Sequence, residues 1–124
     1  MQKIVPHLWF DTQVLEAAEL YVSLFEDSKI NYGELGIFDL ELVMMDHGYG
    51  GDATFNEAIS FIIQCEDQKE IDYYWEKLSF VPEAEACGWV KDLFGLSWQV
   101  IPKMMEELLL NGTKKNLKEL LKHS

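Results

Sequence analysis

The order of hydrophobic periodicities along the chain constrains the fold more than any other feature. The segment 4–10 is a short apolar strand pattern, and the segment after it repeats apolar residues every three or four positions, as one face of a helix does. The same order begins again at 58–65, about 53 residues further on. Few residues are identical between the halves, so we interpret the repeat as one of architecture: two units that each begin with a strand and a helix.

The first half is predicted to contain one helix and several short strands. The helix should end near 26–28, followed by a strand at 29–32, a turn at 33–36 and one or two strands within 37–46. A glycine-rich loop at 47–52 closes this half. The predicted buried face of the helix, which leaves Glu16 and Glu19 outside, consists of Leu15, Ala18, Tyr21, Val22 and Phe25.

The second half repeats this order with a clearer helix start. Asp67 followed by Glu70 is a variant of the capping box. Two strands are predicted at 87–91 and 96–101, with a four-residue turn between them, and the tail at 103–124 has two short helical patterns. The predicted buried face of the second helix consists of Ile71, Tyr74, Trp75 and Leu78.

These elements predict an α+β fold of two βαβββ modules within a single domain. The modules should span 1–52 and 55–102, with the helical tail at 103–124. The helix of such a module covers one face of its sheet, so the other face needs a cover of its own. A second module, from the same chain or from another, is the expected cover.

Composition narrows the class of protein and its partners. The 124 residues, of which 48% are hydrophobic, suffice for one domain with a core. We expect a cytoplasmic protein, because the sequence has neither a signal-peptide pattern nor an apolar run of about 20 residues. A net charge of −12 makes nucleic acid an improbable partner, and no membrane partner is expected. Cys65 is predicted to be buried and Cys87 more accessible, and neither lies in a CxxC pattern.

Seven segments of the chain resemble the PhnB-like family, also known as demethylubiquinone methyltransferase-like. Together they cover nearly the whole chain except 31–54 and the tail, and as a set they are specific. The closest is the last of the seven segments, which read PHLWFD at 6–11, EAAELY at 16–21, LFEDSKI at 24–30, FNEAISF at 55–61, CED at 65–67, YWEKL at 74–78 and CGWVKDLFGLSWQ at 87–99.

The resemblance implies membership of the glyoxalase/bleomycin-resistance superfamily, also called vicinal oxygen chelate. It therefore implies paired βαβββ modules, a homodimer and a cavity between curved sheets. The superfamily includes glyoxalases, extradiol dioxygenases, fosfomycin-modifying enzymes and bleomycin-binding proteins, and the fold alone does not choose among them. The segment between Lys29 and Phe55 is shorter than the resemblance predicts. Either the first module is trimmed, or the chain lacks some residues there.

Metal-dependent members of this superfamily hold a divalent ion with four side chains, one from each inner strand and usually His or Glu. The corresponding positions fall near Val5, Met44 or Met45, Ser60, and Gln99. These side chains are poor ligands for such an ion, so we expect no metal and no cofactor. The nearest substitutes are His7, Asp46 and His47. His7 is predicted to be a partly buried strand residue, and His47 an exposed loop residue.

The methyltransferase label of the family implies a nucleotide-like methyl donor. Such donors are usually bound at a glycine-rich turn between a strand and a helix. The glycine-rich stretch at 48–51 opens no predicted helix, because the next element is a strand. We interpret this stretch as a mobile loop, with a ligand lid as the alternative.

Ligand cavities are lined by aromatic side chains and a few polar groups. The main hypothesis is a metal-free small-molecule-binding protein, which leaves open whether it is an enzyme. The alternatives are a metal-dependent lyase, isomerase or transferase with a rearranged site, and a structural dimeric module whose own aromatics fill the cavity. The predicted lining of the cavity consists of His7, Trp9, Met44, Ser60, Gln64, Trp89 and Gln99.

Overall fold

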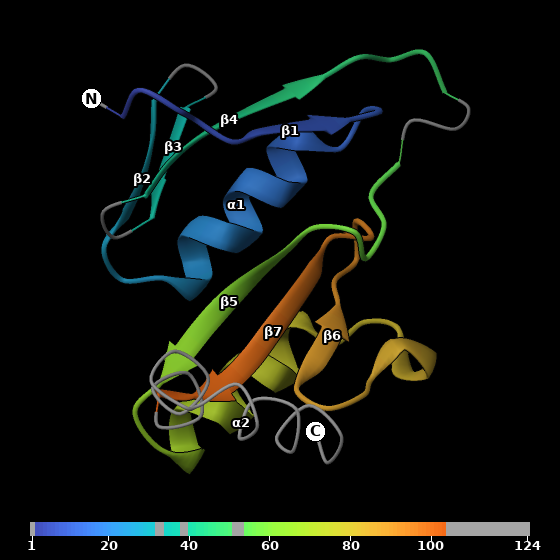
Figure 1. The fold of residues 1–124 in the computed structure, drawn as a ribbon. Coiled ribbons are helices and arrows are strands. Elements are labelled where there is room, and N and C mark those ends of the chain that lie inside the picture. Colours follow the sequence, from blue (N-terminus) through green and yellow to red (C-terminus); the bar gives the residue numbers. More distant parts are fainter. Residues whose placement is uncertain (1, 32–33, 38–39, 51–53, 104–124) are drawn as a thin grey trace. The chain divides into compact units, whose positions relative to one another are not determined.

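The computed structural model describes residues 2–31, 34–37, 40–50 and 54–103 (Figure 1). The chain divides into two compact units, Met1–Phe55 and Asn56–Ser124. Over the described residues, each unit has one small sheet and one α-helix, which confirms the α+β class. The helical patterns predicted for the tail lie outside the described residues from position 104 onward. Within the described ranges, no helix has the length and apolar character needed to cross a bilayer.

The first unit has the full set of strands of a βαβββ module. Its sheet has the order β1-β4-β3-β2, with β1 parallel to β4 and the other pairs antiparallel (Figure 1). The short segment after Lys29 has therefore not removed a strand. The predicted turn at 33–36 was wrong for 34–36, because pairing on both sides of β3 overrides the weak local signal of Gly36. The elements of this unit are β1 (His7–Phe10), α1 (Val14–Leu24), β2 (Ser28–Asn31), β3 (Glu34–Ile37) and β4 (Leu40–Asp46).

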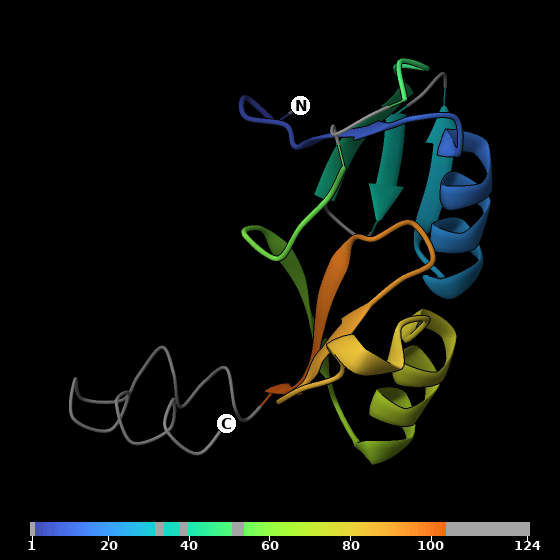
Figure 2. The same cartoon turned by 90° about the vertical axis from the view of Figure 1, so that its right-hand side faces the viewer.

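Helix α1 covers one face of this sheet (Figures 1 and 2). Along β1 the side chains alternate, so Leu8 and Phe10 are buried while His7 and Trp9 are exposed. The same alternation in β4 buries Met44. We call the side of each sheet that its own helix does not cover the open face.

The buried side of α1 differs from the predicted one. Leu15, expected in the core, is 67% exposed, and Ala17 is fully buried in its place. Ala18, Tyr21 and Phe25 are buried as predicted. The helix has few polar residues, so its apolar positions fit several faces, and packing against the sheet selects among them.

The second unit follows the same plan with a smaller sheet. Its strands have the order β5-β7-β6, with β5 parallel to β7 and β6 antiparallel to it. Among residues 56–103, two strands follow α2, and a single 3₁₀ turn stands in the chain order where the first unit has β2. The elements are β5 (Ser60–Cys65), α2 (Gln68–Leu78), η1 (Pro82–Ala84), β6 (Trp89–Lys91) and β7 (Ser97–Pro102).

Helix α2 begins and packs largely as its sequence predicts. The Asp67 side chain accepts a hydrogen bond from the backbone N–H of Glu70 at 2.9 Å, which confirms the predicted cap. Tyr74 and Leu78 are buried, and Trp75 is half-buried. The helix contacts all three strands of its sheet.

A buried aspartate organises the turn between β6 and β7. Asp92 is 1% exposed, and its carboxylate accepts hydrogen bonds from the backbone N–H groups of Phe94 and Leu96 and from Trp98 Nε1, at 2.9 to 3.0 Å. Its backbone carbonyl accepts a further bond from the N–H of Gly95. Asp92 is therefore the turn residue that the sequence predicted.

The predicted strand at 87–91 begins two residues later than expected. Cys87 and Gly88 both have positive φ angles, 53° and 87°, and they form a two-residue turn between the paired Ala86 and Trp89. A glycine is also required at position 88 for steric reasons, because an added Cβ would lie 3.0 Å from a side-chain carbon of Ile101. This turn carries Cys87 to the protein surface.

Candidate functional site

The open face of the second sheet brings together four of the seven predicted cavity residues. The register pairs Gln99 with Ile62 of β5 and with Trp89 of β6. Paired side chains lie on the same face of a sheet, so Trp89 and Gln99 are neighbours there. Strand alternation places Ser60 and Gln64 on this face as well.

Two of these residues are joined by a hydrogen bond. Gln99 Nε2 donates to Ser60 Oγ at 3.0 Å. The sequence predicted that both side chains line the cavity, and in the structure each is the hydrogen-bond partner of the other. Because Ser60 accepts here, its hydroxyl proton is left to donate, and the Gln99 carbonyl oxygen is left to accept. The pair thus presents both kinds of hydrogen-bonding group on the open face.

A pocket of about 640 Å³ lies beside this pair. Its apolar wall comes from the segment around η1, including Val81 and Ala84, together with Trp89. Ser97, which also lines the pocket, is the register partner of Ser60. The pocket therefore adjoins the Ser60–Gln99 pair through β7, although of the seven predicted residues only Trp89 lines it directly.

The pocket contains an ion pair that the sequence did not predict. Lys91 Nζ lies 3.2 Å from Glu57 Oε2, and both residues line the pocket. The hydrogen bond from Lys91 is the main reason that the pKa of Glu57 is lowered. Glu57 is therefore a carboxylate at neutral pH, and it forms an ion pair with Lys91 before any ligand arrives.

In the first unit, two predicted residues share the open face and one does not. His7 and Trp9 both lie on it, and His7 is exposed rather than partly buried as expected. Met44 pairs with Leu8 and is 3% exposed on the helix-covered side. Its neighbour Met45 pairs with Trp9 and is 52% exposed, so β-strand register selects Met45 for the open face.

The prediction for His47 was wrong. Its side chain is fully buried, whereas the sequence suggested an exposed loop residue. The backbone N–H of His47 donates to the carbonyl of Phe10 at 2.8 Å, so the β1–β4 pairing continues past the end of β4. Alternation from Met45 then puts His47 on the same side as Trp9, a signal that the strand pattern already contained.

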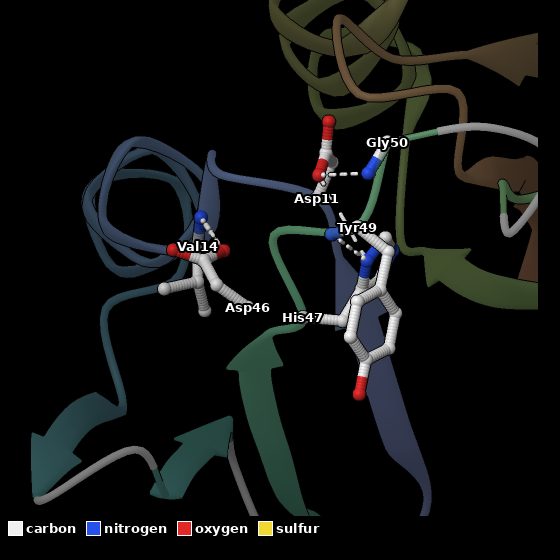
Figure 3. A network of polar contacts seen from close by, with 6 residues as sticks. All are labelled: Asp11, Val14, Asp46, His47, Tyr49 and Gly50. Atoms are coloured by element: carbon white, nitrogen blue, oxygen red, sulfur yellow. Dashed lines mark hydrogen bonds and ion pairs between the residues drawn. The ribbon is translucent and has the colours of Figure 1, made fainter.

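His47 is the centre of a small polar and aromatic network (Figure 3). Its Nδ1 accepts a hydrogen bond from the backbone N–H of Tyr49 at 3.0 Å and lies 3.8 Å from Asp11 Oδ1. Its ring stacks on Tyr49 and meets Trp9 edge to face, with centroids 5.2 and 4.6 Å apart. The Asp11 carboxylate accepts from the N–H of Gly50. The His47 Nε2 atom is buried and has no hydrogen-bond partner within the described part of the chain.

The side chains suggested for a rearranged metal site do not come together. Asp46 Oδ1 accepts a hydrogen bond from the backbone N–H of Val14 at 2.9 Å, so this carboxylate caps helix α1 (Figure 3). His47 Nδ1 is occupied by the N–H of Tyr49. Across the described ranges, no three His, Cys, Asp or Glu side chains are grouped so as to hold a metal ion. The residues present therefore do not fit the divalent ion of the superfamily's metal enzymes.

The residues present do not fit a nucleotide-like methyl donor either. The strand-to-helix connections, at 11–13 and 66–67, contain no glycine. Gly48 and Gly50 follow β4, and the next element described is the strand β5. The glycine-rich turn at a helix start where such donors usually bind is therefore not present among the described connections, and we derive no methyl-transfer step from this chain.

The two cysteines have the environments that the sequence predicted. Cys65 is 1% exposed, and burial, with smaller contributions from the charges of Glu70 and Asp67, raises its pKa to about 11. Its thiol is therefore protonated at neutral pH and is a poor nucleophile. Cys87 is exposed on the turn before β6.

Comparison with known proteins assigns the family. A family model described as 3-demethylubiquinone-9 3-methyltransferase matches residues 2–34 and 32–101. No curated protein gives a significant match. A solved structure from Bacillus cereus is described as "Putative 3-demethylubiquinone-9 3-methyltransferase, PhnB protein". It is 27% identical to this chain with a TM-score of 0.69, and the match covers 82% of this chain and 99% of the Bacillus cereus chain. Protein PA1353 of Pseudomonas aeruginosa is 19% identical with a TM-score of 0.60, covering 83% and 98%, and it shows the fold alone. The chain therefore belongs to this PhnB-like family, described as 3-demethylubiquinone-9 3-methyltransferase.

Proposed function

We propose that this protein binds a small molecule without a metal ion, on the open face of the second unit beside Trp89. The observation that carries the proposal is the pocket that adjoins the Ser60–Gln99 pair. Its volume of about 640 Å³ falls within the range of ligand pockets in proteins. An apolar wall with a few fixed polar groups is also typical of such sites.

The charges around the pocket favour a ligand without a strong negative charge. Lys91 is the one cation among the described lining residues, and Glu57 already balances it at 3.2 Å. Glu83 adds a second carboxylate to the lining. A ligand with an apolar body and an uncharged polar group would fit this balance, because Trp89 offers a flat surface and Ser97 lies near the Ser60–Gln99 pair.

We further propose that the two units are glyoxalase-like modules and that the protein is a homodimer. Both open faces carry exposed apolar side chains, which supports the idea that another sheet covers them. Met45 is 52% exposed in the first unit, and Ile62 is 48% exposed in the second. Sedimentation equilibrium tests this proposal, and a monomer at all concentrations would contradict it. Met45→Glu and Ile62→Glu are expected to weaken association.

Native mass spectrometry of freshly purified protein tests the binding proposal. The expected spectrum contains the protein with a retained organic molecule and no stoichiometric metal ion. If nothing is retained, the fluorescent dye anilinonaphthalene sulfonate serves as a probe, since its emission rises in apolar pockets. We expect saturable binding of one dye per chain. A bound divalent ion, or the absence of both a retained molecule and dye binding, would contradict the proposal.

Matched variants locate the site. Trp89→Leu removes the flat wall of the pocket, and it should weaken retention or dye binding about tenfold, the factor that corresponds to losing one large apolar contact. Tyr73→Leu changes an aromatic side chain on α2 that is 42% exposed and lies outside the pocket lining, and it should leave binding unchanged. Equal effects of the two variants would place the ligand elsewhere.

A further inference from the structure

We propose a second ligand site on the open face of the first unit, at the aromatic cluster formed by Trp9, His47 and Tyr49. Its ligand is a planar ring that bears an uncharged oxygen acceptor, and this oxygen accepts a hydrogen bond from His47 Nε2. The proposal goes beyond the pocket beside Trp89 and shares no residue with it, so either site can fail without the other.

The first step is the protonation state of His47. Its Nδ1 accepts a hydrogen bond from the backbone N–H of Tyr49 at 3.0 Å, so Nδ1 carries no proton. In a neutral imidazole the other nitrogen then carries the hydrogen. His47 Nε2 is therefore a donor, and its tautomer is set by the backbone of the segment that follows β4.

The second step is that this donor lacks an acceptor. The His47 side chain is fully buried, and Nε2 has no hydrogen-bond partner among the described residues. Buried side-chain donors in folded proteins almost always have partners, and an exception calls for an explanation such as a bound water or a functional role. The rings closest to it, those of Trp9 and Tyr49, offer π-faces rather than strong acceptors.

The third step concerns access to the buried nitrogen. Tyr49 stacks on His47 at an interplanar angle of 25°, yet Tyr49 itself is 79% exposed. It stands between Gly48 and Gly50, both at positive φ and both with open space around them. The Tyr49 ring is therefore held mainly by its contacts with His47 and Trp9, and an incoming ring can replace it with little loss of packing.

The fourth step is the chemistry of the ligand. The unpaired donor requires an acceptor oxygen, and the ring of Trp9, 44% exposed, provides a flat surface for a planar ligand. Asp11 Oδ1 lies 3.8 Å from Nδ1, and the chain has a net charge of −12, so an anionic ligand is repelled. A ketone, quinone or similar neutral ring oxygen satisfies all three conditions.

A set of single-ring probes of similar size tests the proposal on the full chain. The probes are acetophenone, ethylbenzene, benzoate and benzylammonium, and the readout is the imidazole ¹⁵N–¹H spectrum of histidine-labelled protein. Acetophenone should move the His47 Nε2–H signal and bind about tenfold more tightly than ethylbenzene, the factor for one hydrogen bond. Benzoate and benzylammonium should bind no better than ethylbenzene.

Three variants make the result decisive. His47→Phe keeps a ring for stacking but removes the donor, so the affinity for acetophenone should fall to the affinity for ethylbenzene. Tyr49→Ala should retain the acetophenone preference and the His47 signal shift, which keeps the test valid if His47→Phe does not fold. Trp89→Leu should change neither. A His47 signal that no probe moves, equal binding of acetophenone and ethylbenzene, or a preference for benzylammonium would overturn the proposal.

Discussion

Each unit buries a polar side chain just beyond the end of a strand, and the two side chains differ in how completely they are hydrogen-bonded. Asp92 follows β6, and its carboxylate accepts three hydrogen bonds from its own turn and from Trp98. His47 follows β4, and one of its two ring nitrogens has no hydrogen-bond partner among the residues that the structure describes. Satisfied buried groups hold a fold together, whereas an unsatisfied one costs stability. The contrast separates a residue kept for architecture from one that is available to a ligand.

The difference comes from the surroundings that each connection supplies. The turn after Asp92 closes within four residues, so backbone N–H groups converge on the carboxylate. The segment after His47 continues through Gly48 and Gly50, both at positive φ, and provides the ring and backbone N–H of Tyr49, while β1 provides the ring of Trp9. A tight turn creates donors for an acid, but an open loop with aromatics leaves an imidazole donor without an acceptor.

The largest effect is expected when the satisfied group is removed. Asp92→Ala would remove the buried carboxylate that accepts from the donors of Leu96 and Trp98, and it should lower the free energy of unfolding by about 3–4 kcal/mol. Urea denaturation measures this. The control is Asp72→Ala, an exposed helix residue bonded to Gln68, which should cost less than about 0.5 kcal/mol. If Asp92→Ala costs no more than its control, the distinction between the units fails.

A smaller loss of unfolding free energy is expected when the residue that caps either helix is removed, and the two helices are capped in different ways. Asp67 caps α2 from the position directly before it, whereas α1 begins after Gln13, whose side chain caps nothing, and takes Asp46 from the end of β4 instead. Asp67→Ala and Asp46→Ala should each cost about 1 kcal/mol of unfolding free energy.

Isolated peptides of the two helices, compared by circular dichroism, sharpen this contrast. Alanine at position 67 should reduce the helicity of an α2 peptide, since its cap is local. A peptide of α1 has no access to the carboxylate from β4. Adding Asp in place of Gln13 should therefore raise its helicity, and an unchanged peptide would show that the start of α1 needs no cap.

The parts of the fold that depend on local signals could be predicted from the sequence. The cap at Asp67 needs only residues within one helical turn, and the turn at Asp92 needs only its own four residues. The strand at Glu34–Ile37 could not be predicted, because its stability comes from pairing with strands on both sides rather than from its own residues. The late start of β6 follows from the paired positive φ angles of Cys87 and Gly88, of which only the glycine is an obvious signal.

The residues of the candidate site also differ in whether a local pattern or a long-range pairing places them. Ser60 and Gln99 were predicted to share a face, because strand alternation and one parallel pairing suffice to place them. Met44 and Met45 could not be told apart, since the choice depends on the register with β1, which a single sequence does not show. The ion pair of Lys91 with Glu57 joins residues 34 positions apart in the chain, and no local pattern reports it.

Removal of the unsatisfied group should have an opposite and smaller effect on stability. His47→Phe deletes the buried donor while keeping an aromatic ring against Trp9 and Tyr49. It also gives up the bond that Nδ1 accepts from Tyr49. The expected net change is a gain of about 0.5–1 kcal/mol in unfolding free energy, because a buried donor without a partner costs more than one partly exposed bond returns. A loss comparable to that of Asp92→Ala would mean that His47 is architectural too.

The smallest change in unfolding free energy is expected at Leu15 of α1, the helix whose buried face was predicted less accurately than that of α2. α2 has one apolar stripe among many charged residues, so its buried face was read correctly, whereas α1 is apolar around most of its circumference. Leu15 is 67% exposed, so Leu15→Glu should change the unfolding free energy by less than about 0.5 kcal/mol. Leu24→Ala, at a side chain 5% exposed on the same helix, should cost about 2–4 kcal/mol in the same urea experiment. If Leu15→Glu costs as much as Leu24→Ala, Leu15 must be buried against another surface in the assembled protein. The first unit would then have a second surface, besides its open face, that needs a cover.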